Sequence, residues 1–203
     1  MRRWVIALGV LGALALSVVV QSHTSSFARG AAQNGWISLF DGRTLKGWQV
    51  HTGGNWKVEK GAIVCPGTSA GWLGTLSPSN DYVLKLQFRG ASSVNSGVFI
   101  RARKEGLPWV VGYECQIWAH MPTGFNTGSL VGSVKAQPAS IIPGHWNQYE
   151  ITAHGDHFVV VLNGKTLLDA HNSKHPTGEV IGLQCNKDNA IEFRDIMLKP
   201  LPR

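Results

Sequence analysis

The sequence has little charge and none of the basic clusters that mark nucleic-acid-binding proteins. Only 15% of its 203 residues are Asp, Glu, Lys or Arg, and no basic run is longer than two residues. The net charge of +7 falls to +4 when Arg2, Arg3 and Arg29 are left out, because 16 Lys and Arg then face 12 Asp and Glu. Binding to nucleic acid needs a clustered basic surface. The dispersed charge therefore excludes nucleic acid as a partner.

Cysteine is scarce, and the common catalytic motifs are missing. The three cysteines form no Cys-x-x-Cys pair, which argues against a zinc or redox site of that kind. There is no His-Glu-x-x-His motif, no Gly-rich phosphate loop and no Gly-x-Ser-x-Gly nucleophile elbow. We therefore expect no metal and no cofactor, although a divalent metal held by residues distant in the sequence stays an open alternative.

The only long apolar run lies at the N-terminus. Arg2 and Arg3 precede Trp4–Val20, an uncharged run of 17 residues, and small residues that suit cleavage follow it. This pattern is typical of a secretory signal peptide, and an uncleaved membrane anchor is the alternative, because 17 residues is near the lower limit for a span. We expect residues 1–32 to be a signal peptide and short spacer, and residues 33–203 to form one domain. The protein that remains after processing would be periplasmic or secreted and would have no stable membrane span.

An exported chain with three cysteines leaves at least one of them without an internal partner. Cys115 and Cys185 each lie between polar neighbours in alternating runs, so both side chains are expected to point into the core. They are either small buried hydrophobic residues or the two ends of a Cys115–Cys185 disulfide.

Helical patterning is nearly absent, since 24 Gly and 9 Pro are spread along the chain and apolar residues alternate with a period of two. Hairpin turns are predicted at Glu59-Lys-Gly61 and at Leu162-Asn-Gly-Lys165. The expected strands are Trp56–Glu59, Ala62–Val64, Tyr82–Arg89, Gly97–Arg103, Gly112–Ile117, Leu130–Lys135, Asn147–His154, Phe158–Leu162, Lys165–Asp169, Gly178–Gln184 and Ala190–Lys199. Short strands without helices between them predict an all-β, two-sheet antiparallel sandwich.

Two of these strands carry polar residues in a pattern that suggests a site. The runs Asn95–Arg101 and Gly112–Ile117 both alternate, and Glu114 and Gln116 share one face of the second, about 7 Å apart. The alternation places Arg101 on a polar face as well. A carboxylate, an amide and a guanidinium between apolar residues are typical of a sugar-binding surface.

Glu114 is the leading candidate for a catalytic residue. The Glu-x-Asp-x-Glu motif of sandwich-fold glucanases is absent, so the usual pair of carboxylic acids is not expected. One carboxylate with amides nearby suits a general base that removes a carbon-bound proton and stabilises the enolate. The alternative is a structural salt bridge from Glu114 to Arg101 or Arg194.

Other candidates are weaker when taken singly. His120 follows the Glu114 strand in a Gly- and Pro-rich loop and is a second catalytic candidate, although exposed loop histidines are often idle. Gln184 and Asn186 continue the polar face of another strand, and Asn147 is either a turn residue or a ligand contact. Trp109 and Trp118 flank the Glu114 strand, and either could stack on the apolar face of a pyranose ring.

Ordered motifs along the chain resemble one family, the 3-keto-disaccharide hydrolase domain. The resemblance covers roughly residues 35–200, and its motifs are jointly specific. They are Trp36-Ile-Ser-Leu-Phe-Asp-Gly42, Leu45-Lys-Gly-Trp48, Trp56-Lys-Val-Glu-Lys-Gly61, Asp81-Tyr-Val-Leu-Lys-Leu-Gln-Phe88, Asn95-Ser-Gly-Val-Phe-Ile-Arg101, Gly112-Tyr-Glu-Cys-Gln-Ile117, Trp146-Asn147, Leu162-Asn-Gly164, Ile181-Gly-Leu-Gln184 and Ile191-Glu-Phe-Arg-Asp-Ile196.

The resemblance implies a concanavalin A-like jelly roll that is typically exported and acts on glycosides oxidised at C3. It implies cleavage by removal of the C2 proton, elimination at C1 and addition of water. Glu114 would be the base or a key sugar ligand, Arg101 and Gln116 would orient the keto-sugar, and Asn95 and Gln184 would be further contacts. The partner would be a small-molecule glycoside or 3-keto-sugar.

Two positions depart from the family pattern. Relatives often carry a histidine where this chain reads Gln184-Cys-Asn-Lys187, and a tyrosine where it has Val131. The missing histidine favours the rival interpretation, a carbohydrate-binding module in which Glu114, Gln116 and Arg101 hold a sugar without turnover. The leading expectation remains an enzyme that cleaves 3-keto-glycosides.

Overall fold

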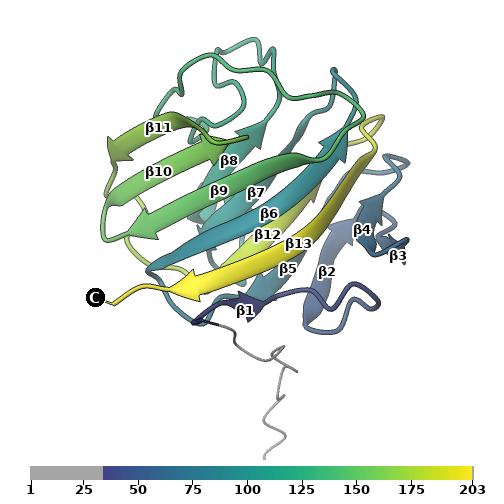
Figure 1. Cartoon of the computed structure of the whole chain (residues 1–203), viewed down its shortest axis with the longest axis horizontal. Coiled ribbons are helices and arrows are strands. Elements are labelled where there is room, and N and C mark those ends of the chain that lie inside the picture. The colour runs from purple at the N-terminus through teal and green to yellow at the C-terminus, as the bar shows by residue number, and fades with distance from the viewer. Residues whose placement is uncertain (1–33, 203) are drawn as a thin grey trace, which may run out of the picture.

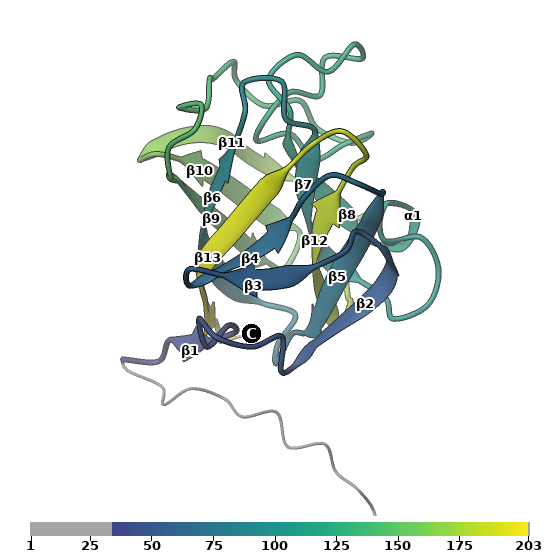
Figure 2. The same ribbon diagram turned by 90° about the vertical axis from the view of Figure 1, so that its right-hand side faces the viewer.

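Two antiparallel sheets packed face to face form the fold. The computed structural model describes residues 34–202, so the predicted signal segment, residues 1–32, lies outside the described residues. The larger sheet has the order β11-β10-β9-β6-β13-β4-β3, with β1 paired to β13, and the smaller has the order β2-β5-β12-β7-β8 (Figure 1). Figure 2 shows the two layers from the side. The predicted all-β sandwich is confirmed.

The strands have the following bounds. The larger sheet contains β1 (Ile37–Ser38), β3 (Lys57–Glu59), β4 (Ala62–Cys65), β6 (Tyr82–Gly90), β9 (Asn147–His154), β10 (His157–Leu162), β11 (Lys165–His171) and β13 (Ile191–Pro200). The smaller sheet contains β2 (Trp48–Gly53), β5 (Gly71–Leu76), β7 (Ser96–Ala102), β8 (Tyr113–Ile117) and β12 (Val180–Cys185). A single helical turn, α1 (Pro108–Val111), connects β7 to β8. No helix within residues 34–202 is long and apolar enough to span a membrane.

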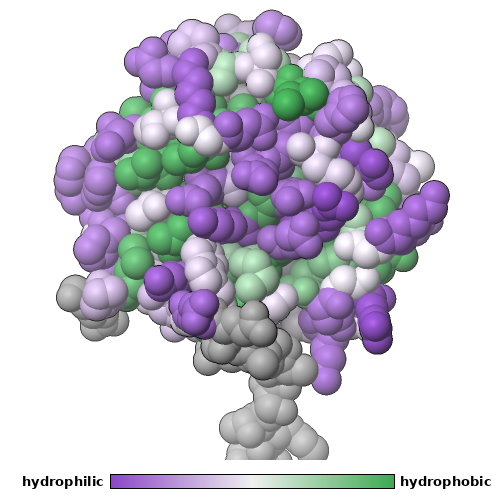
Figure 3. All heavy atoms as spheres, in the orientation of Figure 1, coloured by the Kyte–Doolittle hydropathy of each residue, from purple (hydrophilic) through white to green (hydrophobic). Residues whose placement is uncertain are grey.

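The two sheets bury their facing sides but differ on their outer sides. In β6 every second side chain is buried, as expected for a strand with one face on the core and one in water. The outer face of the larger sheet is mostly hydrophilic (Figure 3). In contrast, all residues of β7 and β8 are buried. The side chains of β7 and β8 that point to the outer face of the smaller sheet are therefore buried as well.

Both predicted hairpin turns are confirmed. β3 and β4 pair in antiparallel fashion around Lys60 and Gly61, which have φ angles of 48° and 78°. β10 and β11 pair around Asn163 and Gly164, with φ angles of 49° and 81°. Two successive positive φ angles are what a type I′ turn requires, so local turn chemistry sets the register of both hairpins.

The predicted strand Leu130–Lys135 is wrong. Leu130 bridges back to Val134, and Gly132 between them has a φ of 70°. A positive φ at glycine reverses the chain at little cost, so the segment forms a tight turn. The alternating pattern of a strand is present there, but the glycine prevents the chain from staying extended.

β1, which has only two residues, β2, β5 and α1 were not predicted. β5 reads Gly-Trp-Leu-Gly-Thr-Leu, and its two glycines remove the alternation that identifies a strand. β2 is an edge strand whose residues are mostly exposed. α1 has only four residues and begins at Pro108, so it is too short to produce a helical period in the sequence.

Of the two alternatives for Cys115 and Cys185, the Cys115–Cys185 disulfide does not form, and Cys185 is bonded to Cys65 instead. β8, which carries Cys115, is separated from β12 by β7, so its cysteine lies two strand spacings from Cys185. That is about 10 Å, beyond the reach of a disulfide. Cys115 stays a buried free thiol, and burial raises its pKa above the ordinary value.

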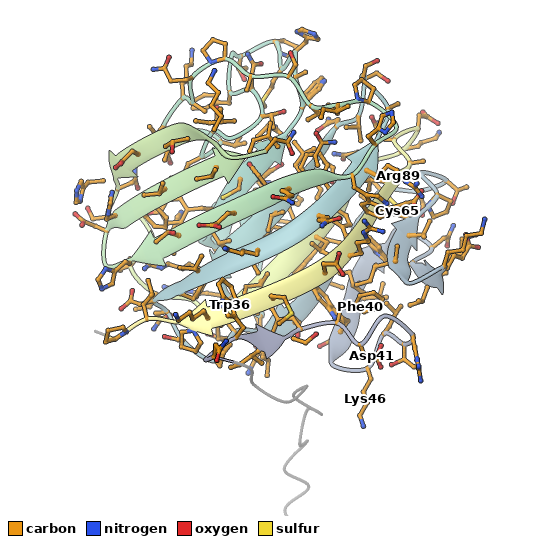
Figure 4. All side chains as sticks on the ribbon, viewed as in Figure 1. Trp36, Phe40, Asp41, Lys46, Cys65 and Arg89 are labelled. Carbon is orange, nitrogen blue, oxygen red and sulfur yellow. A yellow bond between two sulfur atoms is a disulfide. The ribbon has the colours of Figure 1, made fainter. Side chains whose placement is uncertain are left out.

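The observed disulfide connects the two sheets. Cys65 ends β4 in the larger sheet and Cys185 ends β12 in the smaller sheet, with 6.1 Å between their Cα atoms. Figure 4 shows Cys65 near Arg89 at one end of the sandwich. The link closes a loop of 120 residues, and a long closed loop restricts the unfolded chain strongly.

We expect loss of this link to lower the free energy of unfolding by about 2–5 kcal/mol. The measurement is urea unfolding of the oxidised protein, the reduced protein and a Cys65→Ser/Cys185→Ser variant. The variant should match the reduced protein and should not respond to reductant. Equal midpoints for oxidised and reduced protein, or more than one reactive thiol in the unfolded oxidised chain, would contradict the assignment.

Candidate functional site

The main cavity of the described residues lies on the outer face of the smaller sheet. Its volume is about 540 Å³, which is within the range of small-molecule sites. Polar and aromatic side chains from several strands converge in it. The lining residues are Thr52, Ala70, Gly71, Trp72, Asn95, Trp109, Glu114, Gln116, Trp118, Met121, Gln184, Cys185 and Asn186.

Strand register explains why residues distant in the sequence meet here. Trp72 pairs with Gln184 across β5 and β12, and Gln116 pairs with Gly97 across β8 and β7. The neighbouring row places Glu114 opposite Phe99. Residues of adjacent strands that face the same side lie close together. The two rows therefore bring the carboxylate, both glutamines and one indole ring onto one surface.

A glycine leaves room for the carboxylate. A Cβ atom at Gly97 would lie 2.7 Å from Glu114 Oε1, which is shorter than a normal contact. Any side chain at this position would push the carboxylate away from the sheet. The Asn95-Ser-Gly motif thus has a steric reason for its glycine.

Glu114 is almost fully buried, with 7% of its surface exposed. Burial penalises the charged form and raises the pKa of Glu114 to about 7, while a hydrogen bond with the side chain of Gln184 lowers it in part. The alternative, a structural salt bridge from Glu114 to an arginine, is not formed: Arg101 pairs with Asp81, and Arg194 with Asp195. Near neutral pH the carboxyl group therefore exists in both protonation states.

A chain of amides fixes the orientation of Gln184. Asn186 Nδ2 donates to Gln184 Oε1 at 3.0 Å and to the carbonyl of Asn95 at 3.3 Å. With its oxygen occupied, Gln184 presents its N–H groups to the carboxylate of Glu114. Asn186 is thus part of the cavity wall, and it orients the Gln184 amide beside Glu114.

The loop after β8 holds the edge of the strand that carries Glu114. Val131 N–H donates to the carbonyl of Glu114, and Gln116 exchanges backbone hydrogen bonds with Gly128 and Ser129, all at 3.0 Å. These bonds replace the pairing that a further strand would provide. The loop therefore fixes both polar residues of β8.

Gln116 is itself held in place. Its Oε1 accepts from Ile117 N–H at 2.9 Å, and its Nε2 donates to Met121 Sδ at 3.2 Å. The residue is 2% exposed. Gln116 therefore forms part of the rigid cavity wall, with Trp118 and Met121 beside it.

The prediction that the Arg101 side chain lies on a polar face of the sheet is wrong. Arg101 has a φ of 50°, and the register of β7 against β12 shifts between the Val180–Ala102 and Gly182–Phe99 pairs. Such a β-bulge inserts one residue and breaks the alternation of side chains. Arg101 therefore does not share the face of Phe99.

Arg101 instead points into the protein, where it is 1% exposed. Its Nη2 donates to Asp81 Oδ1 at 3.0 Å, its Nε donates to the carbonyl of Asn80 at 3.1 Å, and Nη1 donates to the carbonyl of Gly155. The guanidinium also lies 5.0 Å from the ring centre of Phe158. These contacts make Arg101 a structural residue that connects the two sheets, outside the cavity.

Asn147 and His120 also lie outside the cavity lining. Asn147 is fully buried, and its side chain hydrogen-bonds the backbone of Ile142 and His145 and the side chain of Asn163. It holds the loop before β9, which corresponds to the structural alternative. His120 is exposed in the loop after β8. Of the predicted site residues, the cavity brings together Asn95, Glu114, Gln116, Trp118 and Gln184.

Trp72, Asn186 and Thr52 line the cavity but were not among the predicted site residues. Trp72 lies on β5 and Thr52 on β2, two strands that were not predicted. The alternation of side chains already places Asn186 on the polar face that carries Gln184, but no role in the site was assigned to it.

The cavity offers one acid–base group surrounded by amides. Glu114 is the only carboxylate among the lining residues. Residues 34–202 contain no group of three or more His, Cys, Asp or Glu side chains that could hold a metal ion together. The cavity therefore provides one carboxyl group with a raised pKa, several side-chain amides and a set of indole rings.

Solved structures with the same fold include proteins connected with carbohydrates. A protein from Parabacteroides distasonis, whose designation as a glycosyl hydrolase is provisional, is 24% identical with a TM-score of 0.69, over 83% of this chain and 100% of that chain. A second such protein from the same organism is 21% identical, also with a TM-score of 0.69, over 83% and 94%. The carbohydrate-binding module CBM66 from Bacillus subtilis is 14% identical with a TM-score of 0.60, over 75% and 95%. At these identities the likeness concerns the fold.

No curated protein sequence matches the chain. A family model, described as the 3-keto-alpha-glucoside-1,2-lyase-like domain, matches residues 35–199. This is the family that the ordered sequence motifs resemble, and the match covers most of the chain. The chain therefore belongs to the family of 3-keto-alpha-glucoside-1,2-lyase-like domains.

Proposed function

We propose that this protein is an exported enzyme that cleaves 3-keto-glycosides, with Glu114 as the general base. Membership of the 3-keto-alpha-glucoside-1,2-lyase-like family supports this substrate class. The observation that carries the proposal is a single buried carboxylate, with a pKa raised to about 7, that faces a cavity lined by amides and indole rings. The N-terminal apolar run supports export to the periplasm or the exterior.

The chemistry requires only one base. A ketone at C3 of the sugar acidifies the proton on C2, so Glu114 removes this proton and an enolate forms at C3. The electron pair of the C2–H bond becomes the C1–C2 double bond, and the bond between C1 and the leaving-group oxygen breaks. Addition of water across the double bond then gives net hydrolysis. These reaction steps need one carboxylate, as the cavity has, whereas the usual glycosidase mechanism needs two.

The pKa of Glu114 suits this role. A general base works best when its pKa is near the working pH, because it is then both ionised and basic enough to accept the proton. An exposed glutamate with a pKa near its ordinary value would be ionised but weakly basic. Burial of Glu114 raises its pKa to about 7, so the ionised carboxylate is a stronger base than that of an exposed glutamate.

Side-chain amides are suited to hold the enolate oxygen. Asn95 lines the cavity, and its own backbone N–H is held by Asn189 Oδ1 at 2.8 Å. Its side-chain amide therefore sits on a fixed backbone beside the cavity. Donors that are fixed before the reaction stabilise developing negative charge without reorganisation. Asn95 and Gln184 are the residues that we assign to this role.

A carbohydrate-binding module is the second candidate function. The fold is shared with a carbohydrate-binding module from Bacillus subtilis, and Asn186 stands where relatives often carry a histidine. In this alternative the same residues bind a sugar without turnover. The fate of a 3-keto-glycoside in the cavity separates the two functions.

Glu114→Gln should lower kcat for release of the leaving group by a factor of about 100 or more, because a general base contributes that much. The amide keeps the size of the side chain, so binding of the substrate should persist. The measurement is release of the leaving group from a 3-keto-glucoside. Glu59→Gln on β3, an exposed glutamate of the other sheet, is the matched control and should leave kcat unchanged. Full activity in Glu114→Gln would remove Glu114 as the base, and binding without release by the wild type would support the binding module.

The rate should depend on pH through the ionisation of Glu114. The base is active when deprotonated, and its pKa is raised to about 7. The value of kcat/KM should therefore fall about tenfold per pH unit below pH 7 and level off above it. A profile that stays flat down to pH 5 would mean that a group with an ordinary carboxyl pKa, or no carboxyl group, controls the rate.

A further inference from the structure

An apolar segment with unusual exposure lies at the rim of the cavity. Leu107, Trp109 and Val110 have 52%, 45% and 55% of their surfaces exposed. They make up three of the five large hydrophobic residues that are exposed within residues 34–202. Exposed hydrophobic residues that gather in one place commonly mark a binding site, whereas single ones need no explanation.

The segment is tied closely to the strands that carry the site. α1 lies on the outer side of the smaller sheet, beside β8 (Figure 2). The Trp109 ring packs against Phe99 with 6.1 Å between ring centres, and Phe99 is the register partner of Glu114. A Cβ atom at Gly112 would lie 2.6 Å from Ala102 Cα, so the glycine lets the segment return tightly onto β7. Trp109 is thus a fixed wall of the cavity next to the carboxylate strand.

The cavity has two chemically different parts. The side chains of Asn95, Gln184 and Asn186 supply amides, whereas Trp109 and Trp118 supply aromatic surface. At about 30 Å³ for each water molecule, the cavity volume of about 540 Å³ corresponds to roughly eighteen waters. A hexose ring with its substituents has twelve non-hydrogen atoms. The cavity therefore has room for a sugar and for part of the group attached to it.

We infer that the leaving group of the substrate is a planar, apolar group such as a substituted phenyl ring, and that Trp109 is the surface that holds it. This inference rests on the proposed function and names its substrate class, aryl 3-keto-glycosides. A second sugar brings hydroxyl groups that need hydrogen-bond partners, and Trp109 and Trp118, the aromatic part of the lining, offer only one indole N–H group each. An aromatic ring packs favourably on an indole ring by offset or edge contacts.

The leaving-group chemistry points the same way. Breaking the bond between C1 and oxygen leaves an electron pair on that oxygen, which must carry the charge or receive a proton. A phenol has a pKa of about 10, whereas the pKa of water is about 15.7 and that of an alcohol is comparable. A phenolate can leave without a general acid and take its proton from water later. Among the lining residues Glu114 is the only carboxyl group, and it acts at C2, so a good leaving group matches the groups present.

The test compares three 3-keto-glucosides of the same anomeric form, with 4-nitrophenyl, methyl and glucosyl leaving groups. Trp109→Ala should lower kcat/KM about tenfold for the aryl substrate, the size of a lost aromatic contact, and less than about twofold for the methyl substrate. Val110→Ala, on the same turn and also exposed but outside the cavity lining, is the control and should change none of the three. Trp109→Phe keeps an aromatic face and should retain most of the aryl rate. Trp109→Gln serves in place of Trp109→Ala if the smaller residue disturbs folding.

Two outcomes would overturn the inference. Equal losses for the aryl and methyl substrates would mean that Trp109 supports the sugar ring itself. A loss that is largest for the glucosyl substrate would mean that a second sugar occupies this part of the cavity.

A binding measurement separates failure of this inference from failure of the proposed function. The aryl and methyl 3-keto-glucosides are titrated into Glu114→Gln and into Glu114→Gln/Trp109→Ala by calorimetry. Tighter binding of the aryl compound that disappears with Trp109 supports the inference even if the wild type releases no product. Turnover by the wild type without any aryl preference in binding or rate would leave the proposed function standing and overturn the inference alone.

Discussion

The burial of one carboxylate in the outer face of the smaller sheet is the constraint on which the site depends. Glu114 can lie there because Gly97 on the adjacent strand has no side chain, and because the loop at residues 127–131 completes the hydrogen bonding of β8. Asn186 turns Gln184 toward the carboxylate. Each of these features limits how the carboxylate can move, and together they keep it out of water. The raised pKa of Glu114 is the chemical consequence of that burial.

The rest of the sandwich supports this face. Arg101 is placed by a β-bulge between the two sheets, where Asp81 and backbone carbonyls satisfy its donors, and a buried charge is tolerated only when it is paired in this way. The disulfide between Cys65 and Cys185 connects the sheets at the edge of the cavity, since Cys185 is one of its lining residues. Structural and site residues are therefore neighbours along the same strands. A residue such as Arg101 can stand in a family motif for structural reasons alone.

Much of the fold follows from local patterns, and the errors have identifiable causes. Turn chemistry predicted both hairpins, because Gly61 and the Asn163-Gly164 pair favour the positive φ angles that these tight turns need. Alternation correctly placed Glu114 and Gln116 on one face but failed at Arg101, since a β-bulge has no clear sequence signal. The cavity wall at Trp72 and the disulfide partner of Cys185 depend on which strands become neighbours. Such long-range pairing is set by packing of the whole core, and the local sequence does not encode it.

The titration of Glu114 tests the central claim most directly. The carboxyl carbon of Glu114 can be followed by 13C NMR as a function of pH, with the Glu114→Gln variant identifying its signal. We expect an apparent pKa of about 7. A pKa near the ordinary glutamate value of about 4.3 would mean that water reaches the carboxylate, and it would contradict both the burial of Glu114 and its role as a base.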